Sequence, residues 1–141
     1  MQQSISYRDR DGFVVLKDRV VHRYVTHSCA PAYNWLMQSG LYEKLVTDGL
    51  LIDHAEGVLG RDEQVYYRVL IPKIIHNITL PSEWTANQWK GVVLTFLQIN
   101  MIAINYEMIL KDAIPFNFTF HKGSCVFFDT LSFELYEEGW P

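Results

Sequence analysis

The sequence predicts an α+β fold, in which an antiparallel sheet with short helices is followed by a long helix and a hairpin. Two β-rich runs flank a short turn near the N-terminus, and one long apolar run in the second half has helical spacing. Of the 141 residues, 49% are apolar and 20% are charged. This composition is typical of a folded globular domain and excludes disorder as the main state.

The first half of the chain is expected to hold a hairpin and two short helices. Gly12 to Leu16 and Val20 to Val25 are rich in strand-forming residues and flank Lys17-Asp18-Arg19. Ser28 can cap a helix that runs over 32–38 and stops at Gly40. A second helix, Leu41 to Thr47, has its apolar residues on one face and stops at Gly49.

Two further strands and a connector complete this half. Leu50 to Asp53 and Gln64 to Ile71 are predicted strands, and the second ends at a proline. Residues 73–81 mix apolar and polar side chains and are expected to connect two parts of the fold.

The second half is dominated by one predicted helix. Ser82 is expected to be its N-cap, and the helical spacing of apolar residues runs from Trp84 to about Met108. Because apolar residues also occur on its other faces, we expect this helix to be largely buried. A loop over 110–116 and a hairpin over 117–128, with Lys122-Gly123 at its tip, follow.

Charge and cysteine content exclude several classes. A net charge of −4 without a basic stripe argues against a nucleic-acid-binding protein. Cys29 and Cys125 match no disulfide framework or zinc spacing, so we expect reduced thiols in a cytoplasmic protein. No signal peptide is evident, and Val92 to Ile104 is too short and polar to cross a bilayer, so no membrane association is expected.

Three polar residues near the terminal hairpin have the spacing of a kinase-like catalytic loop. Asp112 is followed five residues later by Asn117, and Asp129 comes directly after the second strand of the hairpin. In phosphoryl transfer, one carboxylate orients the attacking hydroxyl while oxygen ligands hold magnesium on the phosphates. Asp112 is therefore the candidate catalytic base, and Asn117 and Asp129 are the candidate metal ligands, for ATP and Mg.

A structural interpretation of the same residues stays open. Asp and Asn in loops often form caps and Asx turns, and an Asp after a strand often begins a turn.

Arg23 on the second strand and Glu43 on the following helix form a candidate ion pair on the phosphate side of the cofactor. The alternative is an exposed Arg and a helix-surface Glu.

The chain also resembles the kinase-like region upstream of bacterial class I S-adenosylmethionine-dependent methyltransferases of the nodulation type. The resemblance rests on the segment Leu110 to Glu134 and on four shorter pieces: Tyr7 to Val14, His22 to Val25, Leu36 to Tyr42, and Pro81 to Trp84. It implies a truncated protein-kinase-like fold over 1–141, with a strand-rich N-lobe-like part at 1–72, a connector at 73–81 and a long helix with a terminal hairpin at 82–141.

The chain departs from the protein-kinase pattern at several positions. Leu110 stands where kinases place a His, Thr130-Leu131 follows Asp129 in place of Phe-Gly, and no Gly-rich loop precedes the first hairpin. No glycine-rich cofactor loop is present either, so the sequence predicts no S-adenosylmethionine site. We do not expect the chain to methylate by itself.

Three functions remain open from the sequence. The first is a kinase-like binding or regulatory module for a methyltransferase domain or subunit, with ATP and Mg as candidate ligands. The second is an active small phosphotransferase that uses ATP and Mg. The third is a structural or interaction domain, and the sequence determines neither the acceptor substrate nor the oligomeric state.

Overall fold

The computed structural model describes residues 3–5 and 12–139, and the chain divides into two compact units. Unit 1 comprises Met1–Tyr33 and Asp53–Ile74, and unit 2 comprises Asn34–Ile52 and Ile75–Pro141. The sequence-based parts at 1–72, 73–81 and 82–141 differ from this division chiefly because residues 34–52 group with the later part of the chain. Of the pieces that carry the resemblance, residues 7–11 lie outside the described residues.

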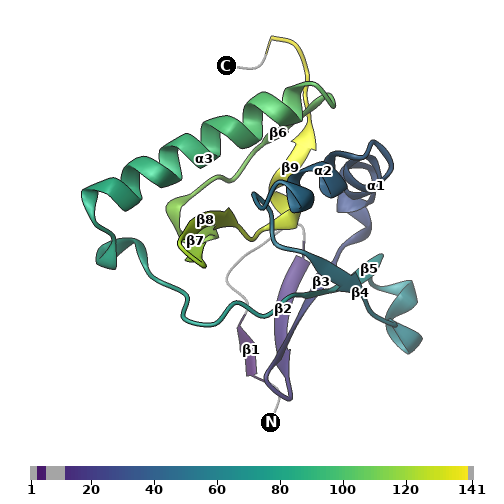
Figure 1. The fold of residues 1–141 in the computed structure, drawn as a ribbon. Helices are drawn as coiled ribbons and strands as arrows, with labels where there is room; N and C mark the ends of the chain where they lie inside the picture. The colour runs from purple at the N-terminus through teal and green to yellow at the C-terminus, as the bar shows by residue number, and fades with distance from the viewer. Residues whose placement is uncertain (1–2, 6–11, 140–141) are drawn as a thin grey trace. The chain divides into compact units, whose positions relative to one another are not determined.

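Unit 1 is built on a five-stranded antiparallel sheet (Figure 1). Its spatial order is β1-β2-β3-β5-β4, with bounds β1 Gln3–Ile5, β2 Gly12–Lys17, β3 Val20–Val25, β4 His54–Glu56 and β5 Arg68–Pro72. Asp18 and Arg19 both have positive φ in the tight turn between β2 and β3. Such a turn matches the right-handed twist of its strands, so the predicted first hairpin is confirmed.

The core of unit 1 contains an aromatic cluster. The rings of Phe13 and Tyr24 are stacked with centroids 4.8 Å apart, and Tyr66 meets both edge-on at 5.0 and 5.1 Å. Val15 and Val69 are buried beside these rings. Offset stacking and edge-on contacts are the favourable geometries for aromatic pairs. The cluster therefore holds β2, β3 and β5 against the loop before β5, which contains Tyr66.

The later strands of unit 1 differ from their predicted bounds. The prediction of a strand over 50–53 was wrong. The regular strand is β4, at His54–Glu56, and Leu51 makes only an isolated parallel bridge with Phe127, within unit 2. The predicted strand over 64–71 begins only at Arg68, since Gly60–Gln64 forms the 3-10 turn η2. Strand propensity alone does not locate the first residue of a strand that follows a short polar turn of this kind.

Short helices join the two units in sequence. After the 3-10 turn η1, His27–Cys29, helix α1 spans Ala30–Gln38, and α2 spans Leu41–Thr47. Gly40 and Gly49 have φ values of 88° and 72°. These left-handed values explain why glycine ends each helix, and the predicted stops are confirmed.

Unit 2 combines α2 with the long helix α3, Ala86–Ile104, and two antiparallel strand pairs. β7, Phe118–His121, pairs with β8, Ser124–Phe127, around the positive-φ residues Lys122 and Gly123, as predicted. β6, Met108–Leu110, pairs with β9, Phe133–Leu135. The remaining turns are the 3-10 segments η3 Pro81–Glu83, η4 Pro115–Asn117 and η5 Thr130–Ser132.

Residues 50–52 attach to the terminal hairpin within unit 2. The backbone N–H of Ile52 donates to the carbonyl oxygen of Phe127 at 2.9 Å, and the N–H of Phe127 donates to that of Leu50 at 2.9 Å. Phe127 is fully buried, between the rings of Phe118 and Phe133. The segment after α2 therefore extends the hairpin by a short parallel bridge.

Helix α3 begins and ends inside its predicted bounds. Thr85, not Ser82, is the N-cap: its hydroxyl oxygen accepts from the N–H of Gln88 at 3.2 Å, and the Gln88 side chain accepts from the N–H of Thr85 at 2.9 Å. Ser82 lies within η3. The sequence prediction was wrong here because both residues are good caps, and only Thr85 has the Gln three positions later that completes a capping box.

The prediction of a largely buried α3 was also wrong. One side of the helix packs on β6, β8 and α2, with Val92, Thr95, Ile99 and Ala103 buried. The opposite side is exposed although it is apolar, because the described part of unit 2 covers only one face.

The combination of helices with antiparallel strand pairs confirms the α+β class. None of the helices in the described residues is long and apolar enough to span a membrane.

Candidate functional site

The three residues of the predicted catalytic loop flank the terminal hairpin in the sequence, and all lie in unit 2. Asp112 follows β6 and is exposed, Asn117 is the last residue of η4, and Asp129 follows β8. The side-chain Nδ2 of Asn117 donates to the backbone carbonyl oxygen of Asp112 at 2.9 Å. The backbone carbonyl of Asn117 accepts from the N–H of Phe128 at 3.0 Å, so the structure brings the loop and the end of β8 together.

The carboxylate of Asp129 caps the turn that follows it. Its Oδ1 accepts from the backbone N–H of Leu131 at 3.3 Å, and its Oδ2 accepts from the hydroxyl of Ser132 at 2.6 Å. Leu131 and Ser132 are both buried. These contacts favour a role for Asp129 in holding η5.

The donor set fits magnesium better than a transition metal. Within residues 3–5 and 12–139, no group of three or more His, Cys, Asp and Glu side chains could hold a metal ion. Asn117 and Asp129 offer one amide oxygen and one carboxylate. Mg²⁺ is usually held by one or two carboxylates together with water and substrate phosphates, so this pair matches its needs only when phosphates are bound.

The predicted ion pair is divided between the two units. Arg23 lies on β3, where it pairs in register with Val14 on β2 and Leu70 on β5. Glu43 lies in the first turn of α2 and is exposed. Because these residues belong to different units, the pairing of Arg23 with Glu43 stays a prediction.

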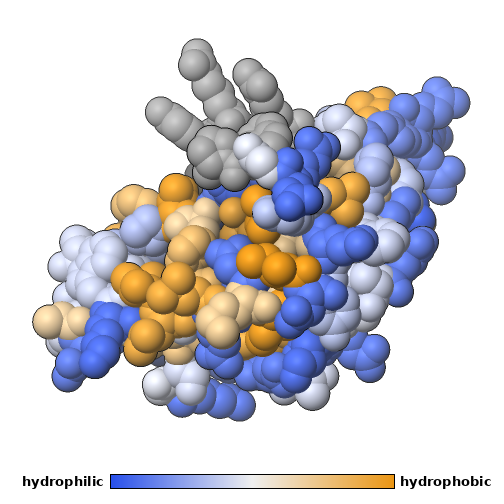
Figure 2. Space-filling model, turned by 90° about the horizontal axis from the view of Figure 1, so that it is seen from above, coloured by the Kyte–Doolittle hydropathy of each residue, from blue (hydrophilic) through white to orange (hydrophobic). Residues whose placement is uncertain are grey.

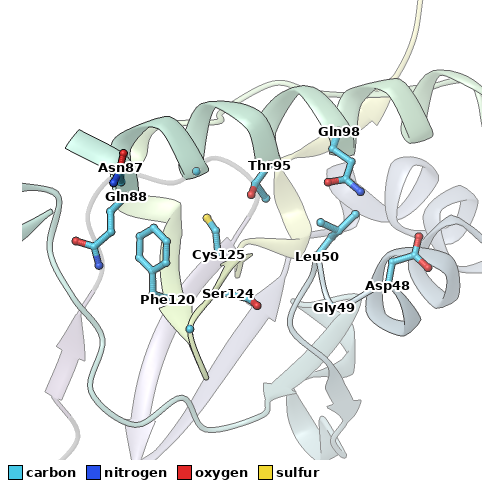
Figure 3. Close-up of a pocket in the computed structure, with 12 residues that line it drawn as sticks. Asp48, Gly49, Leu50, Asn87, Gln88, Thr95, Gln98, Phe120, Ser124 and Cys125 are labelled. Atoms are coloured by element: carbon cyan, nitrogen blue, oxygen red, sulfur yellow. The ribbon is translucent and has the colours of Figure 1, made fainter. Parts of the chain in front are cut away.

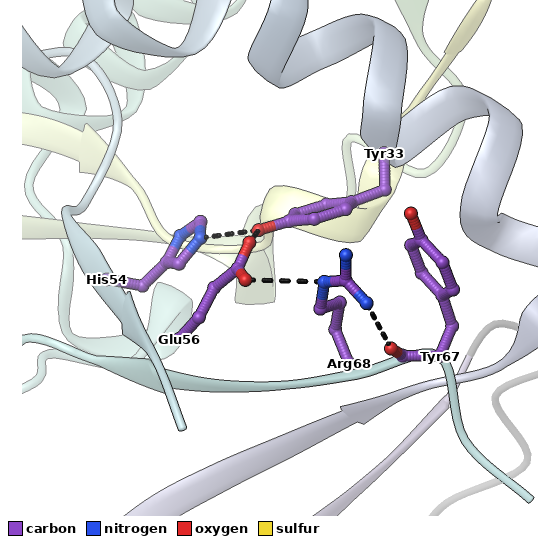
Figure 4. Close-up of polar contacts among 5 residues, drawn as sticks. All are labelled: Tyr33, His54, Glu56, Tyr67 and Arg68. Atoms are coloured by element: carbon purple, nitrogen blue, oxygen red, sulfur yellow. Dashed lines mark hydrogen bonds and ion pairs between the residues drawn. The ribbon is translucent and has the colours of Figure 1, made fainter. Parts of the chain in front are cut away.

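A cluster of polar contacts that the sequence did not indicate lies in unit 1 (Figure 4). The hydroxyl of Tyr33 donates to Oε1 of Glu56 at 2.8 Å and lies 3.1 Å from Nε2 of His54. Because the hydroxyl has one proton and donates it to Glu56, Nε2 of His54 is the donor in the second contact. On the other side, Nε of Arg68 lies 3.3 Å from Oε2 of Glu56.

Partial burial of His54 affects the pKa of its imidazole. Desolvation lowers the pKa of His54 below its usual value, while the carboxylates of Asp53 and Glu56 oppose this. Tyr33 is 3% exposed, and the guanidinium of Arg68 lies over the ring of Tyr67. The residues come from α1, β4 and β5, so no spacing in the sequence could have revealed them. Their contacts follow only from the pairing of β4 with β5 in the sheet.

A hollow of about 580 Å³ lies in unit 2 between α3, the tip of the β7–β8 hairpin and the residues after α2 (Figure 3). Thr95 and Cys125 point toward one another in it, and burial raises the pKa of the Cys125 thiol, although a hydrogen bond with Thr95 opposes that shift. Neither Cys29 nor Cys125 forms a disulfide within the described residues. The rest of the lining includes four polar, uncharged side chains, those of Asn87, Gln88, Gln98 and Ser124, and one aromatic ring, that of Phe120.

The hollow is separate from the predicted catalytic loop, since none of Asp112, Asn117 or Asp129 lines it. Its one carboxylate, Asp48, forms an ion pair with Lys44 at 2.9 Å. A thiol with a raised pKa is a poor nucleophile near neutral pH, so Cys125 has no sign of activation.

Comparison with known proteins shows a distant similarity over nearly the whole chain. No protein-family model matches the chain. The chain is 28% identical over 139 residues to the nodulation protein NoeA of Rhizobium meliloti (strain 1021). This match takes in 95% of the chain and 28% of NoeA, so the chain spans less than a third of the length of that relative. The chain is thus distantly similar to part of a longer bacterial nodulation protein.

Proposed function

We propose that this chain is a kinase-like binding module that works with a class I S-adenosylmethionine-dependent methyltransferase. The observation that carries the proposal is the extent of the match, which takes in nearly all of this chain and under a third of NoeA. A segment of this proportion has the character of one module within a larger assembly. The methyltransferase itself is the partner domain or subunit that the resemblance implies.

The order of elements supports the kinase-like part of the proposal. A five-stranded antiparallel sheet is followed in the chain by the long helix α3 and then by a hairpin flanked by the polar residues Asp112, Asn117 and Asp129. The hydrogen bonds from Asn117 to Asp112 and from Phe128 to Asn117 keep these residues in one loop region. Their proximity supports a role for this loop region in holding nucleotide and magnesium.

The polar contacts of these residues hold the loop region together and do not activate a catalytic base. The amide of Asn117 holds a backbone carbonyl, and the carboxylate of Asp129 holds the backbone and hydroxyl groups of η5. Asp112, the candidate base, is exposed to solvent. A general base works best when surrounding groups fix its geometry and tune its pKa, so these features support a module in which the loop geometry is retained.

With ATP present, Asn117 Oδ1 and Asp129 would hold a magnesium ion against the phosphates. The ion would neutralise phosphate charge. The experiment is thermal unfolding of the chain with and without millimolar ATP and magnesium chloride. Ligand that binds the folded state raises the melting temperature by mass action, so we expect a concentration-dependent increase.

Two variants separate metal binding from turn capping. Asp129→Asn keeps an oxygen for the cap and removes the charge that binds magnesium, so the ATP-dependent increase should disappear. Ser132→Ala removes a hydrogen bond to the same carboxylate and keeps its charge, so the increase should persist. An equal response of the wild type and Asp129→Asn would reject a metal at this residue.

The methyltransferase part of the proposal has its own test. The chain is tagged in its source organism and isolated, and the isolate is assayed for transfer of labelled methyl groups from S-adenosylmethionine. We expect activity in the isolate and neither activity nor S-adenosylmethionine binding in the chain purified alone. An isolate without methyl-transfer activity would contradict the association.

An active phosphotransferase is the second candidate function. It is favoured by the hydrogen bond that joins Asn117 to Asp112, which places a candidate base and a candidate metal ligand in one loop. Phosphate release from ATP that is lost in Asp112→Ala but retained in Ser132→Ala would favour this function over the module. The absence of both nucleotide binding and turnover would leave an interaction domain as the better hypothesis.

A further inference from the structure

The side of α3 that faces away from the core of unit 2 is a continuous apolar surface. We call it the outer face of α3 and define it by Val93, Leu94, Leu97, Met101 and Ile104. These side chains are 54%, 54%, 49%, 72% and 51% exposed, respectively. At 3.6 residues per turn they fall within about 100° of arc and extend along about 17 Å of the helix. Figure 2 views the molecule from the side that carries α3 and shows apolar side chains gathered there.

The outer face is unusual because the opposite face of α3 is also apolar. The buried residues Val92, Ile99 and Ala103 already pack on the core of unit 2. A helix at a protein surface normally carries charged and polar residues on its outer side. A contiguous stripe of exposed apolar side chains instead marks a surface that another protein covers.

The charges near this surface are few and are arranged at its ends. Lys90 is the one charged residue among the 19 residues of α3, and it lies at the N-terminal end of the outer face. Glu107 follows the C-terminal end of the helix and is exposed. The C-terminus of a helix also carries a partial negative charge from its unpaired carbonyl groups.

The spacing of the outer face is nearly symmetric about Leu97. Leu94 and Met101 lie three and four residues to either side of it, and Lys90 and Ile104 lie seven residues to either side. When two such helices pack antiparallel about Leu97, Leu97 meets Leu97 of the other copy, Met101 lies opposite Val93, and Ile104 lies opposite the aliphatic stem of Lys90. The same arrangement brings Lys90 of each copy toward the negative end of α3 in the other, whereas a parallel arrangement would place the two Lys90 side chains together.

We propose that two copies of this chain associate through the outer faces of α3, packed antiparallel about a two-fold axis at Leu97. A two-fold interface uses the same patch on both copies, which requires the self-complementarity described above. With its rim, the contact would remove on the order of 1,000 Å² from water, which is near the lower bound for a specific interface. The dimer is therefore expected to be reversible and to dissociate on dilution.

The test is sedimentation velocity of the full chain between about 1 and 200 μM, with an expected shift from monomer to dimer across this range. The double variant Leu97→Glu/Met101→Glu should remain a monomer throughout, because four carboxylates would meet at the axis. Val58→Glu is the matched control, since Val58 is 93% exposed and lies in unit 1. It should associate as the wild type does.

Further measurements keep the outcome unambiguous. Met101→Gln changes the most exposed residue of the face and should raise the dissociation constant at least tenfold, even if the double variant unfolds. A salt titration should weaken the dimer moderately through Lys90, and Lys90→Glu should weaken it further. A wild-type chain that stays monomeric at 200 μM, or a dimer unaffected by Met101→Gln, would overturn the proposal. A monomer would leave the outer face to another partner, such as the methyltransferase invoked above.

Discussion

The hydroxyl of Ser132 donates a 2.6 Å hydrogen bond to Oδ2 of Asp129, and the same carboxylate accepts from the N–H of Leu131. We therefore expect Asp129→Ala to lower the free energy of unfolding by about 1–2 kcal/mol, because two buried donors lose their acceptor. Ser132→Ala should lower it by about 1 kcal/mol. Urea unfolding at pH 7 measures both values.

The combination of these substitutions tests whether they act on one contact. In the variant Asp129→Ala/Ser132→Ala, the loss should be close to that of Asp129→Ala alone, since the second change removes a donor whose acceptor is already gone. Additive losses would mean that Ser132 stabilises the turn independently of Asp129.

The position of the α3 N-cap gives a second prediction. Thr85→Ala should destabilise the chain by about 1 kcal/mol, because the N–H of Gln88 loses its side-chain acceptor. Ser82→Ala should change stability by less than about 0.5 kcal/mol, since Ser82 lies in η3 and is exposed. Chemical unfolding of both variants provides the comparison. A larger effect at Ser82 would restore the helix start that the sequence suggested.

The Tyr33–His54–Glu56 cluster predicts a pH dependence of stability. The pKa of His54 is lowered in the folded chain, so below about pH 6.5 the unfolded state binds a proton that the folded state does not. The free energy of unfolding should consequently decrease as the pH falls through and below this value. His54→Gln, which cannot titrate, should flatten the curve between pH 7 and 5 in denaturant unfolding experiments.

The companion substitution at Tyr33 separates titration from hydrogen bonding. Tyr33→Phe should cost about 1–2 kcal/mol at pH 8, where His54 is neutral in both states, because the contact with Glu56 is lost. Most of the pH dependence should remain, since it arises from burial of His54. A pH-independent Tyr33→Phe variant would show that the hydroxyl, not burial, controls the histidine.

The thiol of Cys125 yields a fourth prediction. Alkylation requires the thiolate, and burial raises the pKa of this thiol, so iodoacetamide should react slowly at pH 8 and faster as the pH rises past 9. Thr95→Val removes the opposing hydrogen bond and should slow the reaction further at a given pH. Mass spectrometry of the modified peptide follows the rate, and Cys125→Ser reports any background from Cys29. Faster alkylation in Thr95→Val would contradict this assignment.

Local chemistry made several elements predictable. Gly123 adopts positive φ without steric cost and Asp18 tolerates it, which favours the two hairpin turns, and Gly40 and Gly49 end helices for the same reason as Gly123. These features depend on a few neighbouring residues. Ser82 and Thr85 are both possible N-caps of α3. Gln88 identifies Thr85 as the cap, but the apolar spacing that begins at Trp84 favours the earlier residue in a prediction from sequence.

Long-range pairing was not predictable. Strand β9 is three residues long and pairs with β6, whose residues the sequence predicts as a helix end and a loop, and nothing within either segment indicates the other. In the candidate site, the spacing of Asp112, Asn117 and Asp129 anticipated a shared region. The side-chain contacts of Asp129 with η5 depend on the turn after it, which spacing alone does not describe.

The grouping of residues 34–52 with unit 2 has a practical consequence for dividing the chain. The polypeptide passes between the units after Tyr33, after Ile52 and after Ile74, so no single cut releases either unit whole. A fragment that ends at residue 72 would contain Leu50 and Ile52 without Phe127, and would leave Leu41 and Leu45 without their buried surroundings. Limited proteolysis at one crossing should yield nicked chains that stay associated, and a single unit is best made by joining its two segments with a linker.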